Sequence, residues 1–367
     1  MITKPLIPKN LNSNNFDLLR FLLATSVILC HCYAIYYGWE GFAKIEPLMK
    51  WSGGKISIGS AAVNFFFVIS GFLIVRSFEY SSSFGEYLKK RMLRIYPGFI
   101  VAFVLSLFLF GPIGHMTTFT QSAFFDYLNL IPSKRELANM LSLQSPLEAV
   151  YFTNLPQSGL NNSLWTIQYE FICYLLVPVL VWLGMTKNKW LLFVVLFLSY
   201  AFLCLQSLGY VFQYHQSLSG GVIGNPYYYP RFFTYFLCGS CIYVFRNDIP
   251  RSMGLAFISI VLVLLGLKLK LLDVFWPFTT TYLLFYFSYH TKLQFPNFAK
   301  HGDLSYGIYL YGWPIQQLVM LYFGKYFNPL TFFVAVLPIV IVFAFFSWKL
   351  VEGPALKLKK KRILKVA

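Results

Sequence analysis

The sequence predicts an all-α fold, a polytopic bundle of membrane-spanning helices. Its composition, the length of its apolar segments and the distribution of its charges all indicate this class. Of the 367 residues, 57% are hydrophobic and only 12% are charged, whereas soluble domains are closer to half apolar and a quarter charged. So few charges cannot cover the surface of a globular protein of this size. An ordinary cytosolic or secreted domain, a disordered chain and a disulfide scaffold are therefore excluded.

A helix that crosses a bilayer needs about 20 predominantly apolar residues. Ten segments of this kind follow one another along the chain, at about 18–37, 57–77, 94–113, 164–184, 189–208, 231–246, 252–270, 272–290, 304–324 and 329–350. A shorter apolar piece near 121–131 predicts a re-entrant or interfacial helix. Because no long-period repeat marks a second domain, we expect a single domain over residues 1–367, with a core at about 14–356 and a basic tail at 357–367.

The loops carry unequal numbers of cations, which predicts the orientation. When loops are assigned alternately, the side that holds the N-terminus contains 18 lysines and arginines and the other side contains 8. Cytoplasmic loops hold the excess of Lys and Arg, so both termini are expected in the cytoplasm, in a plasma (inner) membrane. The formal net charge of +17 is thus explained by topology and by contact with anionic membrane lipids, not by nucleic-acid binding.

The first apolar segment contains two ionisable residues, Arg20 and His31. Such residues inside a span are costly and usually face a polar interior. Eleven residues of helix bring the two side chains within about 20° of one face and separate them by about 16.5 Å. A functional pair is the favoured interpretation, and a histidine that only packs is the alternative. A metal site at Cys30-His31-Cys32 is not expected, because consecutive helical residues point about 100° apart.

The fourth and the second predicted spans contain further candidate residues. Glu170 lies inside the fourth span at a depth similar to that of His31, so the two side chains could meet. A carboxylate that orients an imidazole favours general-base chemistry. The alternative is that Glu170 is the buried structural partner of a tyrosine or a backbone group. Ser70-Gly71 in the second span would allow close approach of a backbone or a ligand; Ser70 is a weaker candidate nucleophile, with no adjacent base visible in the sequence.

Arg91 and Arg94 precede the third span at its inner end. Residues three apart are neighbours on one helical face, and two guanidinium groups in this arrangement can bind phosphates. Ordinary positive-inside anchoring is the alternative.

At this point the chain resembles the integral-membrane acyltransferase family 3, which contains bacterial O-acetyltransferases that modify surface polysaccharides. The resemblance covers residues from about 14 to 356. It rests on six blocks in the family's order: Arg20 to His31, Phe65 to Phe72, Arg91 to Arg94 with Tyr96-Pro97, Ser163-Leu164-Trp165 with Glu170 and Tyr174, Ser305 to Leu310, and Glu352-Gly353-Pro354. Many members carry a histidine where this chain has Gly312, so His31 is the intramembrane imidazole that we expect to act here.

The resemblance implies acetyl-CoA or another acyl-CoA as donor and a glycan hydroxyl as acceptor, carried by an O-antigen, an exopolysaccharide or a lipid-linked sugar. Arg20, Arg91 and Arg94 are then expected to hold the phosphates of the donor. His31, oriented by Glu170, is expected to remove the proton of the hydroxyl, with a covalent acyl-histidine as the alternative. Trp165, Tyr169 and Ser70 are the expected acceptor contacts. A transporter of glycans or lipid-linked sugars is the competing function, and a homodimer or a partner protein remains open.

Overall fold

The computed structural model describes residues 5–8, 10–11, 13–115, 120–146, 152, 154–185, 188–210, 223–290, 294–295, 298–300 and 302–359. Within these residues the chain is helical and contains no β-strand, which confirms the predicted all-α class. Several cations used for the orientation, Lys4, Lys9, Lys187 and Lys292, and the end of the basic tail at 360–367 lie outside the described residues.

The N-terminal half begins with a long helix that is broken once. In order, its helices are α1 (Phe16–Ile45), α2 (Pro47–Trp51), α3 (Ile58–Glu79), α4 (Phe84–Leu105), the π-helix η1 (Ser106–Phe110), α5 (Gly111–His115), α6 (Gln121–Asn129) and α7 (Ser133–Leu141). Inside α1, Gly38 leaves the helical conformation with φ 68° and ψ 172°, a region that glycine adopts without a steric penalty. The break follows directly on the predicted end of the first span at residue 37. The short apolar piece predicted at 121–131 forms α6.

The C-terminal half follows the remaining predicted ranges. Its helices are α8 (Trp165–Trp182), α9 (Trp190–Ser207), the short η3 (Pro226–Tyr228), α10 (Tyr229–Val244), α11 (Met253–Leu269), α12 (Leu272–His290), α13 (Ser305–Phe323), the short η4 (Gly324–Tyr326), α14 (Pro329–Ser347), the π-helix η5 (Trp348–Glu352) and α15 (Gly353–Lys357). The start of α14 is fixed by Asn328, whose side chain accepts hydrogen bonds from Leu330 N and Thr331 N, satisfying amide groups that have no partner inside the helix.

Each of the ten predicted spans thus overlaps a helix, but not all of these helices have the length and composition of a span. Six helical segments among the described residues are long and apolar enough to cross a membrane: 16–51, 58–79, 84–115, 165–182, 190–207 and 329–357. The helices α10 and α11, with 16 and 17 residues, are shorter than a typical span, and α13 carries Gln316 and Gln317. The described chain is therefore a helical protein with six candidate membrane helices.

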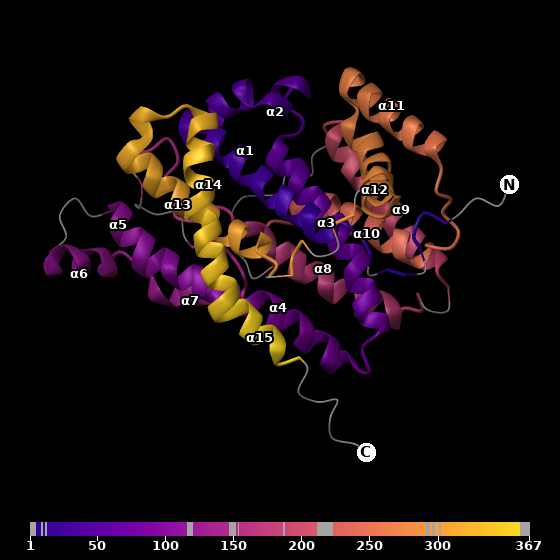
Figure 1. Ribbon diagram of the computed structural model, residues 1–367, viewed down its shortest axis with the longest axis horizontal. Helices are drawn as coiled ribbons and strands as arrows, with labels where there is room; N and C mark the ends of the chain where they lie inside the picture. The colour runs from indigo at the N-terminus through magenta and orange to yellow at the C-terminus, as the bar shows by residue number, and fades with distance from the viewer. Residues whose placement is uncertain are drawn as a thin grey trace, which may run out of the picture.

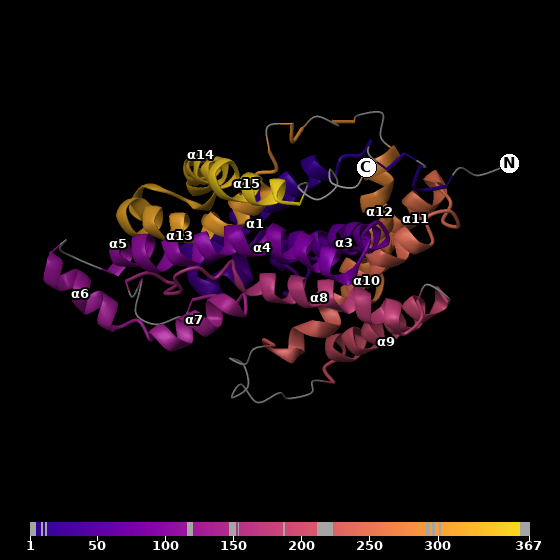
Figure 2. The same ribbon diagram turned by 90° about the horizontal axis from the view of Figure 1, so that it is seen from below.

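The helices are arranged in layers around α3. Figure 1 shows α1 crossing the centre of the molecule, and in Figure 2 α3 and α4 form a middle layer with α14 on one side and α9 on the other. The closest crossing joins α3 to α10. A Cβ atom added at Gly71 would overlap the carbonyl oxygen of Phe236, and one added at Gly239 would overlap the carbonyl oxygen of Val68. Small residues that let two backbones meet are typical of helix packing in membranes, and this crossing fixes the position of Ser70 beside Gly71.

A methyl group at either glycine should therefore separate the two helices. We expect Gly71→Ala and Gly239→Ala each to lower the thermal unfolding midpoint of the detergent-solubilised protein by several degrees, because overpacking costs about 1–3 kcal/mol and more where backbone must move. Gly254→Ala in α11 is the matched control, since its Cβ would meet only Ser252 Oγ at 3.5 Å. Midpoints equal to that of the control would show that the α3–α10 crossing is looser than described.

Candidate active site

A cavity of about 420 Å³ lies where α1, α3, α4, α8 and α13 meet, a size within the range of small-molecule sites. Its charged lining residues are Arg20, Arg91, Arg94, Glu170, Asp303 and Lys359. Successive turns of α8 contribute Thr166, Glu170 and Tyr174 to the lining, so the cavity extends about 12 Å along this helix. It is therefore an elongated space whose cations come from α1, from α4 and from Lys359, two residues beyond α15.

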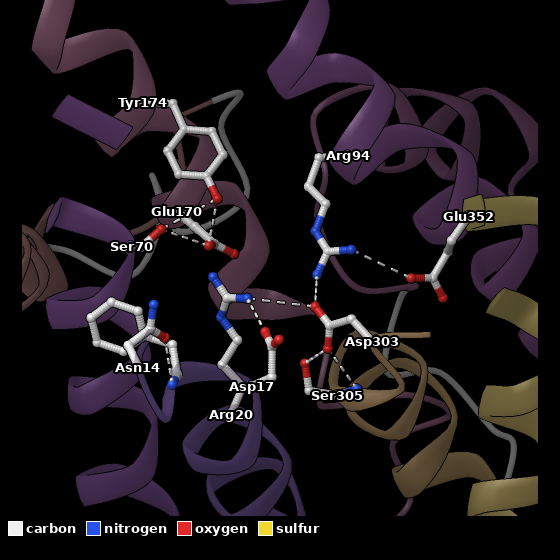
Figure 3. Close-up of polar contacts among 11 residues, drawn as sticks. Asn14, Asp17, Arg20, Ser70, Arg94, Glu170, Tyr174, Asp303, Ser305 and Glu352 are labelled. Atoms are coloured by element: carbon white, nitrogen blue, oxygen red, sulfur yellow. Dashed lines mark hydrogen bonds and ion pairs between the residues drawn. The ribbon is translucent and has the colours of Figure 1, made fainter. Parts of the chain in front are cut away.

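Asp303 holds two of the arginines at this cavity. Its Oδ2 atom lies 2.6 Å from Arg94 Nη2 and 3.7 Å from Arg20 Nη1, and its Oδ1 atom accepts hydrogen bonds from the backbone and hydroxyl groups of Ser305. Figure 3 shows the guanidinium groups of Arg94 and Arg20 both directed at this carboxylate. Although burial opposes its ionisation, the charges of Arg94 and Arg20 lower the pKa of Asp303 to about 2. The carboxylate is therefore charged at any physiological pH and links α1, α4 and the start of α13.

The arginines have further contacts, which differ in kind. Arg20 Nη1 also lies 3.4 Å from Asp17 Oδ1, one turn earlier in α1. Arg94 Nη1 also faces Glu352 Oε2 at 3.9 Å, and the Glu352 side chain is only 2% exposed. Arg91 has no salt bridge among the described residues. Its Nη2 atom donates to Ser77 Oγ at 3.1 Å, its guanidinium lies 5.8 Å from the centre of the Tyr174 ring, and its Nε atom is buried without a hydrogen-bond partner in the described chain. Arg91 is thus the guanidinium in this cavity that is most available to a bound anion.

Glu170 lies deeper in the cavity and has two hydroxyl partners. Its Oε1 atom accepts a hydrogen bond from Tyr174 at 2.6 Å and one from Ser70 at 3.0 Å, and Ser70 Oγ lies 3.3 Å from the Tyr174 hydroxyl. The tyrosine partner considered for Glu170 in the sequence analysis is therefore present. Ser70 also has the adjacent carboxylate that could not be seen in the sequence, because the two residues come from different helices.

His31 occupies a separate environment at the interface of α1 and α13. Its ring meets the edge of the Trp313 ring at a centroid distance of 4.9 Å. The side chain is partly exposed, while its Nδ1 atom is buried with no hydrogen-bond partner among the described residues. His31 does not belong to the lining of the cavity, and the printed partners of Glu170 are Ser70 and Tyr174, so the structure does not bring the imidazole and the carboxylate into contact.

His31 nevertheless lies close to one end of the cavity. Tyr309 lines the cavity, and Trp313, which contacts His31, follows four residues later in α13. Residues four apart lie on the same helical face about 6 Å apart. The hydroxyl groups of Tyr309 and Thr166 share a hydrogen bond of 2.5 Å at this end of the cavity. About one helical turn thus separates the cavity from the ring contact of His31.

Trp165 and Tyr169, the expected acceptor contacts, also lie outside the lining. Trp165 is 36% exposed and packs against Tyr228 and Phe232. Tyr169 is buried, and its hydroxyl donates to the Asn225 carbonyl and accepts from the Asn225 amide. These contacts join the start of α8 to the chain segment before α10.

Of the residues singled out from the sequence, five therefore surround one cavity: Arg20, Ser70, Arg91, Arg94 and Glu170. The sequence analysis missed Asp303 and Lys359. Asp303 could have been noticed because it is one of only 13 acidic residues and lies two residues before the block that begins at Ser305. Lys359 belongs to a run of cations in which no single position stands out.

The chain that forms this cavity matches a known protein family. The family model described as "Acyltransferase domain" matches residues 13–349, nearly the whole chain. The chain belongs to this acyltransferase family, and the resemblance drawn from its six sequence blocks is confirmed.

Two relatives cover the chain almost completely. An "O-acetyl transferase" of Shigella phage Sf6 is 30% identical over 344 residues, which are 93% of this chain and 95% of that protein. "Nodulation protein 10" of Rhizobium leguminosarum bv. viciae is 26% identical over 390 residues, which are 94% of this chain and 94% of that protein. No solved structure matches the chain significantly.

The ion pair of Asp303 with Arg94 should contribute measurably to stability. We expect Asp303→Asn and Arg94→Gln each to reduce the free energy of unfolding by about 1–3 kcal/mol, since hydrogen bonds between charged groups lie in this range, and the double variant to lose less than the sum. Lys189→Gln is the control, because its pair with Asp248 is about half exposed and should contribute about 0–1 kcal/mol.

The pH dependence of this contribution follows from the lowered pKa of Asp303. A carboxyl group with a folded-state pKa of about 2 and an ordinary value of 3.8 stabilises the fold fully above pH 4 and loses that effect as the pH falls through about 2. The difference in melting temperature between wild type and Asp303→Asn should therefore be equal at pH 5 and pH 8. A difference that shrinks between these values would contradict the assignment of a charged Asp303.

Proposed function

We propose that this protein is a membrane O-acyltransferase, with acetyl as the favoured acyl group. It would move the acyl group from cytoplasmic acyl-CoA to a hydroxyl group of a surface or lipid-linked glycan. The observation that carries the proposal is the elongated cavity with Arg20, Arg91, Arg94 and Lys359 in its lining, found in a member of an acyltransferase family. The relative named as an O-acetyl transferase supports transfer to oxygen. We further propose ten spans with both termini in the cytoplasm of a plasma (inner) membrane, in agreement with the distribution of cations.

The donor end of the site is assigned from charge. Coenzyme A carries several phosphates, and guanidinium groups bind phosphate oxygens through paired hydrogen bonds. Arg20 is paired with Asp17 and Asp303, and Arg94 with Asp303 and Glu352. Arg91 has no salt bridge among the described residues, and its Nε atom is buried there without a hydrogen-bond partner. Arg91 therefore retains positive charge for an incoming anion. In the proposed orientation this end of the cavity opens toward the cytoplasm, where acyl-CoA is made.

The acyl end is assigned to the far end of the cavity, toward Thr166 and Tyr309. A donor whose phosphates lie at the arginines would extend its thin pantetheine arm along α8, past Glu170. To meet His31, the thioester must pass the hydrogen bond between Thr166 and Tyr309. Rotation of the Tyr309 side chain is the smallest movement that would connect the cavity with the imidazole.

In the proposed reaction, the acceptor oxygen attacks the thioester carbonyl while His31 takes the hydroxyl proton. The carbon–sulfur bond breaks, the carbon–oxygen bond of the ester forms, and the proton passes to the departing thiolate to give free coenzyme A. The Nδ1 atom of His31 has no hydrogen-bond partner among the described residues, so this nitrogen is free to accept the proton. The alternative is a covalent acyl-histidine that the acceptor then cleaves.

We also propose a catalytic role for Glu170, because the pantetheine arm of the bound donor would pass this carboxylate. Its contacts with Ser70 and Tyr174 orient two hydroxyl groups toward the cavity. We propose that Trp165 and Tyr169 contribute to an acceptor surface on the outer side, since aromatic rings accept sugar faces and Trp165 is partly exposed.

Loss of His31 should abolish transfer without loss of the fold. We expect His31→Ala to reduce acyl transfer by about 10²–10⁴-fold, the range of general-base contributions. The measurement uses purified protein, isotopically labelled acetyl-CoA and surface glycan from the organism that carries the protein. His115→Ala, at the end of α5, is the control histidine and should retain activity. A fully active, correctly inserted His31→Ala variant would exclude the proposed base, and a protein that moves glycans but never transfers label would establish the competing transporter function.

Loss of Arg91 should act on the donor. We expect Arg91→Gln to raise the KM for acetyl-CoA by about 10-fold or more, because a hydrogen bond between charged groups contributes about 1.5–3 kcal/mol, with a smaller change in kcat. Lys89→Gln removes an exposed cation from the same helical turn and should leave the KM unchanged. Equal effects of the two substitutions would indicate only general attraction of the donor by surface charge.

A further inference from the structure

The C-terminal end of the last helix brings an additional cation to the cavity. Lys359 lies two residues beyond α15, where its backbone N–H donates to the Leu356 carbonyl at 3.3 Å. Both Lys359 and Leu356 line the cavity, because α15 packs against α4, the helix that carries Arg91 and Arg94. Residues more than 260 positions apart in the chain therefore meet at one end of the site.

The charge of Lys359 is not neutralised within the described chain. No acidic side chain among the described residues forms a salt bridge with it, and the charged groups that act on it are Arg91, Arg94 and Lys90, all on α4. Lys90 is paired with Glu86 at 2.7 Å, and Arg94 is paired with Asp303. Arg91 and Lys359 are thus the two cations at this end of the cavity that have no carboxylate partner in the described structure.

We propose that Lys359 binds the phosphate groups of coenzyme A together with Arg91, so that the C-terminal segment completes the donor site. This inference rests on the proposed function, since it assigns a further residue to the same donor. A lipid headgroup offers the same phosphate chemistry, but Lys359 lines the cavity and is partly buried, which favours a ligand that enters the cavity.

The surroundings of Lys359 make its contribution dependent on pH. Burial and the neighbouring charges of Arg91, Arg94 and Lys90 lower the pKa of Lys359 to about 7, whereas Asp303 and Glu352, the nearby carboxyl groups, are engaged by Arg94. An anion bound beside the amine favours its charged form. Binding should therefore take up a fraction of a proton near pH 7 and weaken as the pH rises through this range.

The test is calorimetric titration of coenzyme A into the full-length protein in detergent, at pH 6 and 8 and in buffers of different ionisation enthalpy. We expect Lys359→Gln to weaken binding at pH 6 by about 10-fold, the effect of one hydrogen bond to a charged group, and to abolish the proton uptake. Lys359→Arg should retain the affinity, because the side chain stays charged. It should also lose the proton uptake of the lysine, because arginine is already protonated before the ligand binds. This variant corrects for the titration of the phosphate itself, whose second pKa is about 6. Lys357→Gln, an exposed neighbour in α15, is the control.

The outcomes separate the possibilities. Coenzyme A binding that depends on Arg91 but is unchanged in Lys359→Gln would overturn the role of Lys359 and leave the proposed function intact. No binding of coenzyme A to the wild-type protein would overturn both. Nanodiscs of neutral and anionic lipids provide the last comparison: if Lys359→Gln alters only the response to anionic lipid and not the affinity for coenzyme A, the lysine is a lipid contact and the inference is wrong.

Discussion

A single carboxylate between two arginines is the interaction on which the cavity depends. Asp303 joins Arg20 on α1 to Arg94 on α4, and through Ser305 it ties both to the first turn of α13. Two guanidinium groups this close would repel each other without an anion between them. Asp17 and Glu352 add a second carboxylate to Arg20 and to Arg94, so the positive charge that remains at the cavity is that of Arg91 and Lys359, which have no salt bridge within the described chain.

The helix packing around this cluster is of a different kind. The crossing of α3 and α10 is closed by glycines at positions 71 and 239, which bring the backbones together, and nearer one end Arg231 of α10 donates a hydrogen bond to Asn64 of α3. This approach holds α3 so that Ser70 faces Glu170 and Tyr174 of α8. Polar side chains in the interior of a membrane protein are stable only when they find partners, and here the three hydroxyl and carboxyl groups satisfy one another. The cavity is thus polar where side chains converge and apolar along most of its length.

The family membership and the geometry agree more directly on the proposed donor site at the arginines than on the proposed catalytic role of His31. Three arginines, one lysine and an elongated cavity suit the long, phosphorylated donor that we propose, whereas His31 lies about one helical turn beyond the cavity, against Trp313. If His31 is the base, as proposed, its separation from the donor until an aromatic side chain moves would protect the thioester, since exclusion of water prevents hydrolysis of reactive groups. The contact between Tyr309 and Thr166 occupies the position where such a movement would act.

The sequence by itself determined the helical class, the ten apolar segments that coincide with helices, and the arginines and the glutamate that surround the cavity, because charges within apolar runs are rare enough to identify one by one. It also determined the family through motifs that remain recognisable along the chain. Only the tertiary structure decided which of these residues meet. Depth along a helix can be counted from the sequence, but the direction in which a side chain points depends on how the helices are packed. For this reason Glu170 bonds to Ser70 and Tyr174, His31 contacts Trp313, and Asp303 and Lys359, which were not singled out from the sequence, join the site.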